Sequence, residues 1–359
     1  MTLPFPSPPW MAVALLLGLA GAAWLRLARH LSHLREPPGR RLGVHAADGW
    51  EVAVFHRAPA ARRYREPVVL AHGLGVTHRF MDFEPPWSLA HALNEAGFDT
   101  FAVDFRGTGG SGRWWGGHGV DEHVLQDVPA VLEAVRRETG AERVLWVGHS
   151  LGGLIGLAAA REPLAGQLRG LVTLGSPVFL GRRPLLARAL RLGLLLSWPF
   201  RLRSSWLTLL ATPLVGWVKL PFAEVVMNPR HVPVEVQRKL SGRVLASIGH
   251  GVLRQLWDWM ESGALRSRDG VVDYRSRALG LDLPLLFCGG TVDQLAPAES
   301  VARAFEASAS RDKALRLFGR AHGHLEDYGH GDLCFGTGAP TEVFPVVRQW
   351  LEARATAVP

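Results

Sequence analysis

The sequence predicts an α/β fold with a mostly parallel central sheet, flanking helices and an inserted helical cap. Short apolar runs typical of strands alternate along the chain with segments typical of helices. One such run leads through a Gly-x-Ser-x-Gly turn into a helical segment rich in small residues. A long stretch, residues 178–280, then interrupts the order of the strands. These three observations predict the core and the position of the cap.

The turn is the first element that indicates chemistry. It consists of Gly148, His149, Ser150, Leu151 and Gly152. The apolar run 144–147 precedes it and the small-residue segment 153–160 follows, so we expect a strand, a sharp turn and a helix. Gly148 and Gly152 lack a Cβ atom, which lets the chain turn tightly and the helix approach the strand. Ser150 is then exposed at the top of a strained turn, as a nucleophile must be.

A serine nucleophile also needs N–H donors for the oxyanion that forms in the reaction. The glycine-rich turn 72–75 follows the apolar run 67–71, so it is expected at the carboxyl edge of the sheet. We assign one donor to the N–H of Leu74 and the other to the N–H of Leu151. Taken alone, the turn is more typical of an ordinary glycine turn with a satisfied histidine. Its position ahead of the Gly-x-Ser-x-Gly turn favours the catalytic interpretation.

The acid that orients the base is expected after a late strand. Asp293 follows the strand-like run 283–290 and is our candidate. Asp104 also ends a strand-like run, but it precedes the serine and opens a glycine turn, so we interpret it as a carboxylate that braces a loop. The segment 175–177 follows another strand-like run and contains no carboxylate, which removes the usual alternative position.

Three histidines compete for the role of the base. His322, His324 and His330 all follow the last apolar run, 314–318. Spacing along the chain slightly favours the nearer pair, His322 and His324. The residues alone leave the choice open.

Three further stretches are similar to a known family. They are residues 79–90, residues 104–107 and the run Tyr-Gly-His-Gly-Asp-Leu at 328–333. Residues 44–353 resemble members of the α/β-hydrolase superfamily. Within that superfamily, these three stretches are similar to acid lipases and to bacterial hydrolases that resemble polyhydroxyalkanoate synthases. In that group the catalytic histidine begins a His-x-Asp element, so the resemblance implies His330 as the base. His322 and His324 are then loop residues.

The residue at the turn also separates this chain from other members of that superfamily. The polymerising synthases carry cysteine there, and dehalogenases and epoxide hydrolases carry aspartate. This chain has Ser150, and its two cysteines, Cys288 and Cys334, lie elsewhere. The resemblance therefore implies a serine hydrolase and excludes those chemistries.

The amino-acid composition indicates which binding partners and cofactors to expect. Two cysteines in 359 residues provide no disulfide framework, and the histidine-rich region shows no convincing metal-ligand pattern, so we expect neither a metal nor a cofactor. The net charge of +8 comes mostly from arginines mixed with Trp and Leu, without a nucleic-acid motif. An anionic membrane surface is therefore the expected partner, and nucleic acid is not.

The N-terminal segment is predicted to be a membrane anchor. Residues 10–25 carry no charge, and counting from Phe5 the run approaches the ~20 residues needed to cross a bilayer. No Lys or Arg precedes it, whereas five arginines follow it, at positions 26, 29, 35, 40 and 41. This order disfavours a cleaved signal peptide and places the catalytic domain in the cytoplasm. The alternative is a buried or surface helix of the domain itself.

We divide the chain accordingly. Residues 1–36 form the anchor and linker, with lipid contact through residues 5–29; residues 37–177 and 281–359 form the core; residues 178–280 form the cap. In the cap, residues 184–196 predict a helix with a broad leucine face, and Trp206 and Trp217 follow. Such a cap either meets the membrane or packs permanently on the core. In both cases Leu, Phe and Trp line the pocket and favour an apolar ester as substrate.

The sequence thus predicts a membrane-anchored serine hydrolase of carboxylic esters that works through an acyl-enzyme intermediate. Two alternatives remain. An acyltransferase would use the same triad with another acceptor than water. A catalytically idle hydrolase fold would serve as a membrane-tethered binding module, although the complete triad argues against it.

Overall fold

The computed structural model describes residues 9–112, 117–161, 163–181, 184–197, 204–218 and 223–359. In this part of the chain one sheet has the order β1-β2-β4-β3-β5-β6-β7-β8. Its strands are β1 Arg40–His45, β2 Glu51–Arg57, β3 Val68–Ala71, β4 Thr100–Asp104, β5 Val144–His149, β6 Leu168–Leu174, β7 Leu285–Gly290 and β8 Lys313–Phe318. The pairs β1–β2 and β2–β4 are antiparallel, and all other pairs are parallel.

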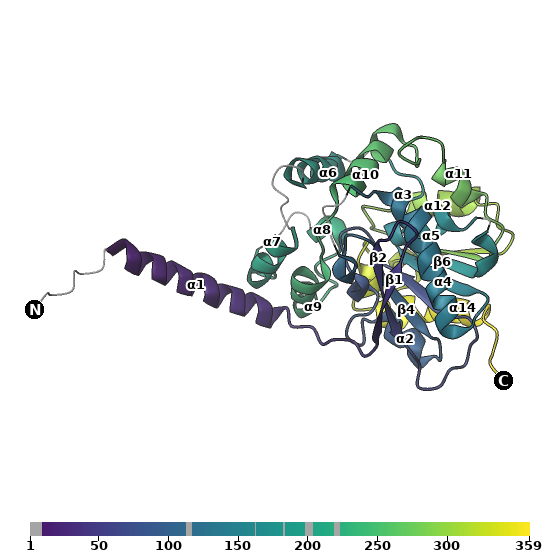
Figure 1. The fold of residues 1–359 in the computed structure, drawn as a ribbon, viewed down its shortest axis with the longest axis horizontal. Coiled ribbons are helices and arrows are strands. Elements are labelled where there is room, and N and C mark those ends of the chain that lie inside the picture. The colour runs from purple at the N-terminus through teal and green to yellow at the C-terminus, as the bar shows by residue number, and fades with distance from the viewer. Residues whose placement is uncertain (1–8, 113–116, 162, 182–183, 198–203, 219–222) are drawn as a thin grey trace, which may run out of the picture.

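Helices cover both faces of this sheet and form the cap (Figure 1). They are α1 Pro9–Leu31, α2 Leu89–Glu95, α3 Val120–Glu122, α4 Val128–Thr139, α5 Leu151–Ala159, α6 Pro184–Ser197, α7 Ser204–Ala211, α8 Ala223–Val226, α9 Val234–Lys239, α10 His250–Ser262, α11 Tyr274–Leu279, α12 Ala298–Ala307, α13 Asp332–Phe335 and α14 Phe344–Glu352. The mostly parallel sheet with flanking helices confirms the predicted fold class.

The core consists of two apolar layers, one on each side of the sheet. Successive residues of β3 point to opposite layers: Val69 packs with α4 and α5, and Leu70 packs with α2 and α14. This alternation follows from the two-residue period of a strand. Both layers are apolar because helices cover both faces of the parallel strands, which explains why these strands read as continuous apolar runs.

The predicted strands are present. The structure has two further strands, β1 and β2, that were not predicted from the sequence. These two strands form an antiparallel hairpin at one edge of the sheet. The turn between them contains Asp48-Gly49, and Gly49 has a φ of 80°. A hairpin of this kind needs a residue that tolerates positive φ, so the Asp-Gly pair was the signal available in the sequence.

The insertion between β6 and β7 is helical, as the cap prediction requires. It contains α6 to α11, and α6 coincides with the helix expected at residues 184–196. Helix α10 packs against α6 through a small apolar cluster of Leu190, Leu253 and Met260. Several large apolar side chains on this insertion stay exposed, among them Trp206, Leu207, Leu210 and Trp217, the last 83% exposed.

Helix α1 extends away from the body of the molecule (Figure 1). Its residues Val13–Leu31 are long and apolar enough to cross a bilayer, and very little of that stretch is buried. Residues 5–8, the start of the predicted lipid contact, lie outside the described residues.

The last turn of α1 and the residues after it do pack on the body. Ala28, Ser32 and Leu34 are buried, and Trp24 donates from Nε1 to the carbonyl oxygen of Leu210 in α7 at 2.8 Å. Residues 1–36, predicted to form the anchor and linker, therefore also contact the cap and the body at their C-terminal end. The physical reason is the cap, which offers this segment a surface that the sequence pattern does not reveal.

Candidate active site

Ser150 lies at the turn between β5 and α5 and has strained backbone angles. Its φ is 53° and its ψ is −119°, and no other non-glycine residue in the described part of the chain has a positive φ. Close packing holds the turn: a Cβ atom on Gly152 would lie 2.4 Å from the carbonyl oxygen of Ala71. The Ser150 N–H donates to the carbonyl oxygen of Leu174 at 2.8 Å. Strain maintained in this way is characteristic of functional positions.

Asp293 and His330 form a buried pair at the same edge of the sheet. The Nδ1 atom of His330 lies 2.8 Å from Oδ2 of Asp293. The other carboxylate oxygen, Oδ1, accepts the N–H groups of Leu295 and Ala296, each at 2.8 Å. These two bonds fix the carboxylate by its own turn and leave Oδ2 for the histidine. The imidazole then presents Nε2 away from the carboxylate, as a base oriented by an acid does.

Two contacts place this pair beside the serine. The Nε2 atom of His149, the residue before Ser150, lies 3.1 Å from the carbonyl oxygen of His330. The glycine after β6, Gly175, would bring a Cβ atom to 3.1 Å from Asp293 Oδ2 and 3.2 Å from His330 Nδ1. No hydrogen bond joins the Ser150 side chain to His330 among the bonds of the described residues. Such contacts are often long before substrate binds.

The turn after β3, residues 72–75, also packs against Ser150. A Cβ atom on Gly73 would lie 3.0 Å from Cβ of Ser150. Within the described chain, the N–H groups of Leu74 and Leu151 have no hydrogen-bond acceptor. Two unoccupied N–H groups flanking a serine are the arrangement that an oxyanion requires.

His72 holds this turn in place. Its Nδ1 atom lies 2.7 Å from the carbonyl oxygen of Gly73, so Nδ1 carries the proton. Its Nε2 atom accepts the N–H of Phe105 at 3.3 Å and lies 3.2 Å from the Thr108 hydroxyl. Burial lowers the pKa of His72 to about 4, which keeps the ring neutral in this role. His72 is therefore a satisfied structural histidine, and it braces the turn that carries Leu74.

The other histidines of the C-terminal region lie elsewhere. His322 is exposed, and His324 contacts the backbone of Gly319 and the ring of Phe318. Asp104, interpreted above as a bracing carboxylate, accepts the backbone N–H of His78 at 2.6 Å and that of Gly110 at 2.7 Å. Both cysteines are buried and unpaired. No group of three or more His, Cys, Asp or Glu residues suited to a metal occurs in the described part of the chain.

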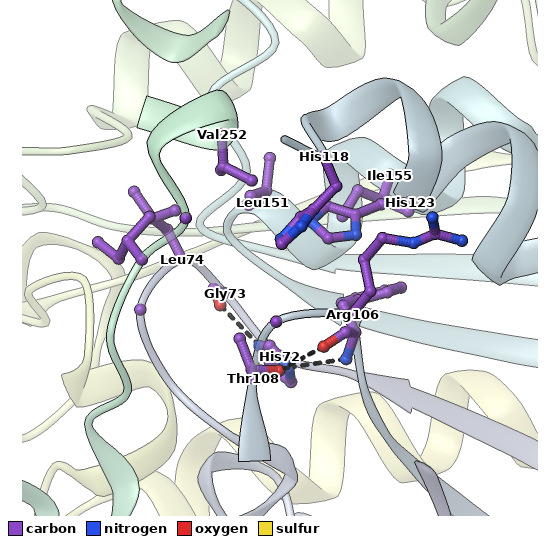
Figure 2. Close-up of a pocket in the computed structure, with 15 residues that line it drawn as sticks. His72, Gly73, Leu74, Arg106, Thr108, His118, His123, Leu151, Ile155 and Val252 are labelled. Carbon is purple, nitrogen blue, oxygen red and sulfur yellow. Dashed lines mark hydrogen bonds between the residues drawn. The ribbon is translucent and has the colours of Figure 1, made fainter. Parts of the chain in front are cut away.

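A small pocket lies next to the turn, between the loops after β3 and β4 and the start of α10 (Figure 2). Leu74 and Leu151 belong to its wall, together with the apolar side chains of Ile155 and Val252. Its wall also includes His118 and His123, which belong to none of the motifs found in the sequence.

Comparisons with known proteins agree with this architecture. The profile of the family described as serine aminopeptidase, S33, matches residues 62–327. A tear acid lipase-like protein from Mesocricetus auratus is 32% identical over 106 residues, 26% of this chain and 26% of that protein. Triacylglycerol lipase 2 from Arabidopsis thaliana is 30% identical over 161 residues, 42% of this chain and 35% of that protein. The chain thus spans about a third or less of these curated relatives.

A solved structure is similar to this chain over nearly the whole fold. A soluble variant of the monoglyceride lipase from Saccharomyces cerevisiae, in complex with a substrate analogue, has a TM-score of 0.62 and 19% identity. The alignment covers 90% of this chain and 98% of that one. The resemblance to α/β-hydrolases with lipase-like relatives is confirmed. Since the family profile covers most of the chain, this protein belongs to the serine aminopeptidase S33 family of the α/β-hydrolase superfamily.

Proposed function

We propose that this protein is a serine hydrolase that cleaves carboxylic esters of apolar acyl substrates. The observation that carries the proposal is the convergence of the strained Ser150 with the buried Asp293–His330 pair and the unoccupied N–H groups of Leu74 and Leu151. This set supplies a nucleophile, an oriented base and oxyanion donors, which are the parts that acyl transfer needs.

The reaction follows from these parts. His330 Nε2 takes the proton of the Ser150 hydroxyl as its oxygen attacks the ester carbonyl. The N–H groups of Leu74 and Leu151 bind the oxyanion of the tetrahedral intermediate. As the C–O bond breaks, the alcohol leaves with the proton from His330, and the acyl group stays on Ser150. Water then gives a proton to His330 and attacks the acyl carbonyl. The bond between Ser150 Oγ and the acyl carbon breaks, Oγ takes the proton from His330, and the carboxylic acid leaves. Asp293 stabilises the imidazolium in both stages.

Two observations support an apolar ester as substrate. Apolar side chains of Leu74, Leu151, Ile155 and Val252 form the wall next to the oxyanion donors. The curated relatives reported above carry the names of lipases, whereas the family carries the name of an aminopeptidase. The apolar wall favours an acyl chain over a charged peptide terminus.

We also propose that α1 spans a membrane and holds the cap against it, with the catalytic domain in the cytoplasm. Support comes from the exposed apolar length of α1 and from its contact with α7 through Trp24 and Leu210. The exposed side chains of Trp206 and Leu207 lie on the same helix, α7, so lipid is the partner that suits both elements.

The experiment that tests the enzymatic proposal uses a fluorophosphonate probe. The full-length protein is treated with the probe and digested, and the labelled peptide is sequenced by mass spectrometry. We expect one label, on Ser150, and none after denaturation. Hydrolysis of p-nitrophenyl butanoate and of leucine p-nitroanilide is compared on the same preparation, and we expect the ester to be preferred. An unlabelled Ser150, or a preference for the anilide, contradicts the proposal.

A further inference from the structure

A second carboxylate–histidine pair lies beside the proposed active site and takes no part in the reaction above. His123 Nδ1 lies 3.0 Å from Oδ2 of Asp127, and both residues are buried. The ring of His123 belongs to the wall of the same small pocket as Leu74 and Leu151 (Figure 2). The pair therefore lies next to the N–H groups proposed to bind the oxyanion.

The positive charge beside this pair, on Arg106, is already paired with carboxylates. Asp127 accepts Nε of Arg106 at 2.7 Å and the Arg106 backbone N–H at 3.1 Å. Although burial opposes ionisation, the bonds from His123 and Arg106 lower the pKa of Asp127. The guanidinium of Arg106 also contacts Asp48 at 2.5 Å, so it is paired with two carboxylates. The pocket therefore offers no free positive charge to an anion, and a neutral ligand suits it better.

Two ring nitrogens in the pocket remain available for hydrogen bonds. The Nδ1 atom of His123 is occupied by the carboxylate of Asp127, and the described residues provide no partner for its Nε2. His118 is 6% exposed, and its Nδ1 has no hydrogen-bond partner in the described structure. Burial, followed by the charges of His123 and Arg106, lowers the pKa of His118 to about 4, so its ring is neutral and offers one donor and one acceptor.

The rings of His118 and His123 lie next to each other in the wall of this pocket. Their centroids are 5.8 Å apart in an edge-on arrangement, so a polar group that enters here meets both rings. A hydroxyl group both donates and accepts a hydrogen bond, so it can pair with an imidazole nitrogen in either role. Buried polar groups without partners are rare in folded proteins, so the unpaired Nδ1 of His118 itself points to a ligand.

We propose that His118 and His123 bind a hydroxyl group of the substrate close to the ester that Ser150 cleaves, and so select hydroxylated esters over plain ones. The inference rests on the proposed ester hydrolysis and specifies its substrate class. The hydroxyl belongs either to the acyl chain, as in a hydroxyacyl ester, or to the alcohol, as in a partial glyceride. The chemistry recognised is the same in both cases: an apolar chain on the walls and one hydroxyl beside two histidines.

Matched pairs of substrates test this subsite. For the acyl side, kcat/KM is measured for p-nitrophenyl 3-hydroxybutanoate and p-nitrophenyl butanoate. For the alcohol side, it is measured for 1-monobutanoylglycerol and propyl butanoate. We expect the hydroxylated member of one pair to be preferred about tenfold, the usual effect of one additional hydrogen bond that leaves no buried group unpaired. The pair that shows the preference identifies the side that carries the hydroxyl.

Variants at His118 separate binding from packing. His118→Phe keeps the ring that contacts Trp50 and His123 but removes both nitrogens, so the preference falls to about onefold. His118→Asn places a polar atom near the position of Nδ1 and retains part of the preference. His322→Phe, in an exposed loop, is the matched control and leaves the ratio unchanged. Equal ratios in wild type and His118→Phe for both pairs overturn the subsite.

A binding measurement keeps the subsite testable if no ester is hydrolysed. The thermal midpoint of Ser150→Ala is measured with methyl 3-hydroxybutanoate, methyl butanoate and 1-monobutanoylglycerol. Absence of turnover alone contradicts the proposed function. A midpoint raised by a hydroxylated compound only, and lost on adding His118→Phe, supports the subsite independently. Equal midpoints with all three compounds contradict it.

Discussion

The side chain of His149 and the backbone of His330 are joined by a hydrogen bond of 3.1 Å, from Nε2 of His149 to the carbonyl oxygen of His330. A carbonyl oxygen only accepts, so Nε2 carries the proton. Burial, then the charge of His330, lowers the pKa of His149 well below its usual value, so the ring is neutral. The strand that precedes Ser150 is thereby tied to the loop that carries the proposed base.

His149→Phe is expected to lower kcat about 10- to 100-fold with little change in KM. The phenyl ring can occupy the same space against Phe80, but the bond to His330 is lost, and a small displacement of a base has effects of this size. Steady-state kinetics on p-nitrophenyl butanoate provide the measurement, with His324→Phe as control. A kcat within twofold of wild type shows that the bond does not position the base.

His330→Ala is expected to abolish ester hydrolysis, and His324→Ala and His322→Ala to leave it within a few-fold of wild type. The reason is that the structure pairs His330 with Asp293, whereas His324 bonds to the backbone of Gly319. The kcat values of the three variants decide the assignment. Loss of activity in His324→Ala with activity retained in His330→Ala would return the role of base to the residue that spacing favours.

Three neutral buried histidines make stability depend on pH. Burial holds the pKa values of His72 and His118 at about 4, against 6.5 for the unfolded residue, and that of His149 also lies well below 6.5. Below pH 6.5 the unfolded chain binds these protons first, so the free energy of unfolding falls as pH decreases toward 4. The slope reaches up to about 1.4 kcal/mol per pH unit for each histidine.

Urea unfolding between pH 7.5 and 4.5 measures this dependence. The full stability is present above pH 6.5, and His118→Phe is expected to show a shallower decline because one of the three groups is removed. A free energy of unfolding that is constant over this range, or that rises as pH falls, contradicts the neutral buried state of these rings.

Two truncations distinguish the role of α1 in membrane binding from its contribution to stability through contacts with the cap. A protein lacking residues 1–22 retains Trp24, Ala28 and Ser32, so we expect it to leave the membrane fraction and to keep its thermal midpoint. A protein lacking residues 1–36 also loses the buried Ala28, Ser32 and Leu34, and its midpoint is expected to fall by about 5 °C. Alkaline carbonate washing and thermal unfolding measure the two effects. Release of the full-length protein by the wash, or equal midpoints for both truncations, contradicts this account.

The parts of the fold and of the candidate site that depend on local pattern could be predicted from the sequence. Parallel strands such as β5 are covered on both faces and therefore appear in the sequence as apolar runs. The Gly-x-Ser-x-Gly turn around Ser150 has the spacing expected where a strand turns sharply into a helix. The position of Asp293 followed from the same logic. Choosing His330 required a resemblance, because strand order alone does not separate histidines in one loop region.

The remaining features depend on contacts between distant segments. The bond from His149 to His330 joins residues 181 positions apart, and His118 meets Trp50 from another part of the chain. The buried turn of α1 likewise depends on a cap that lies far along the sequence. Tertiary packing decides such contacts, and no periodicity or motif encodes them.

The kcat of Ser150→Ala tests the central claim most directly. Both Ser150→Ala and the control Ser176→Ala are assayed on p-nitrophenyl butanoate, because the hydroxyl of Ser176 only donates to the backbone carbonyl of Ser150 at 2.9 Å. Loss of the nucleophile from a triad costs on the order of 10⁶ in kcat, so we expect Ser150→Ala to be inactive with an unchanged thermal midpoint, and Ser176→Ala to remain active. A Ser150→Ala protein that hydrolyses the ester within tenfold of the wild-type rate would contradict the account.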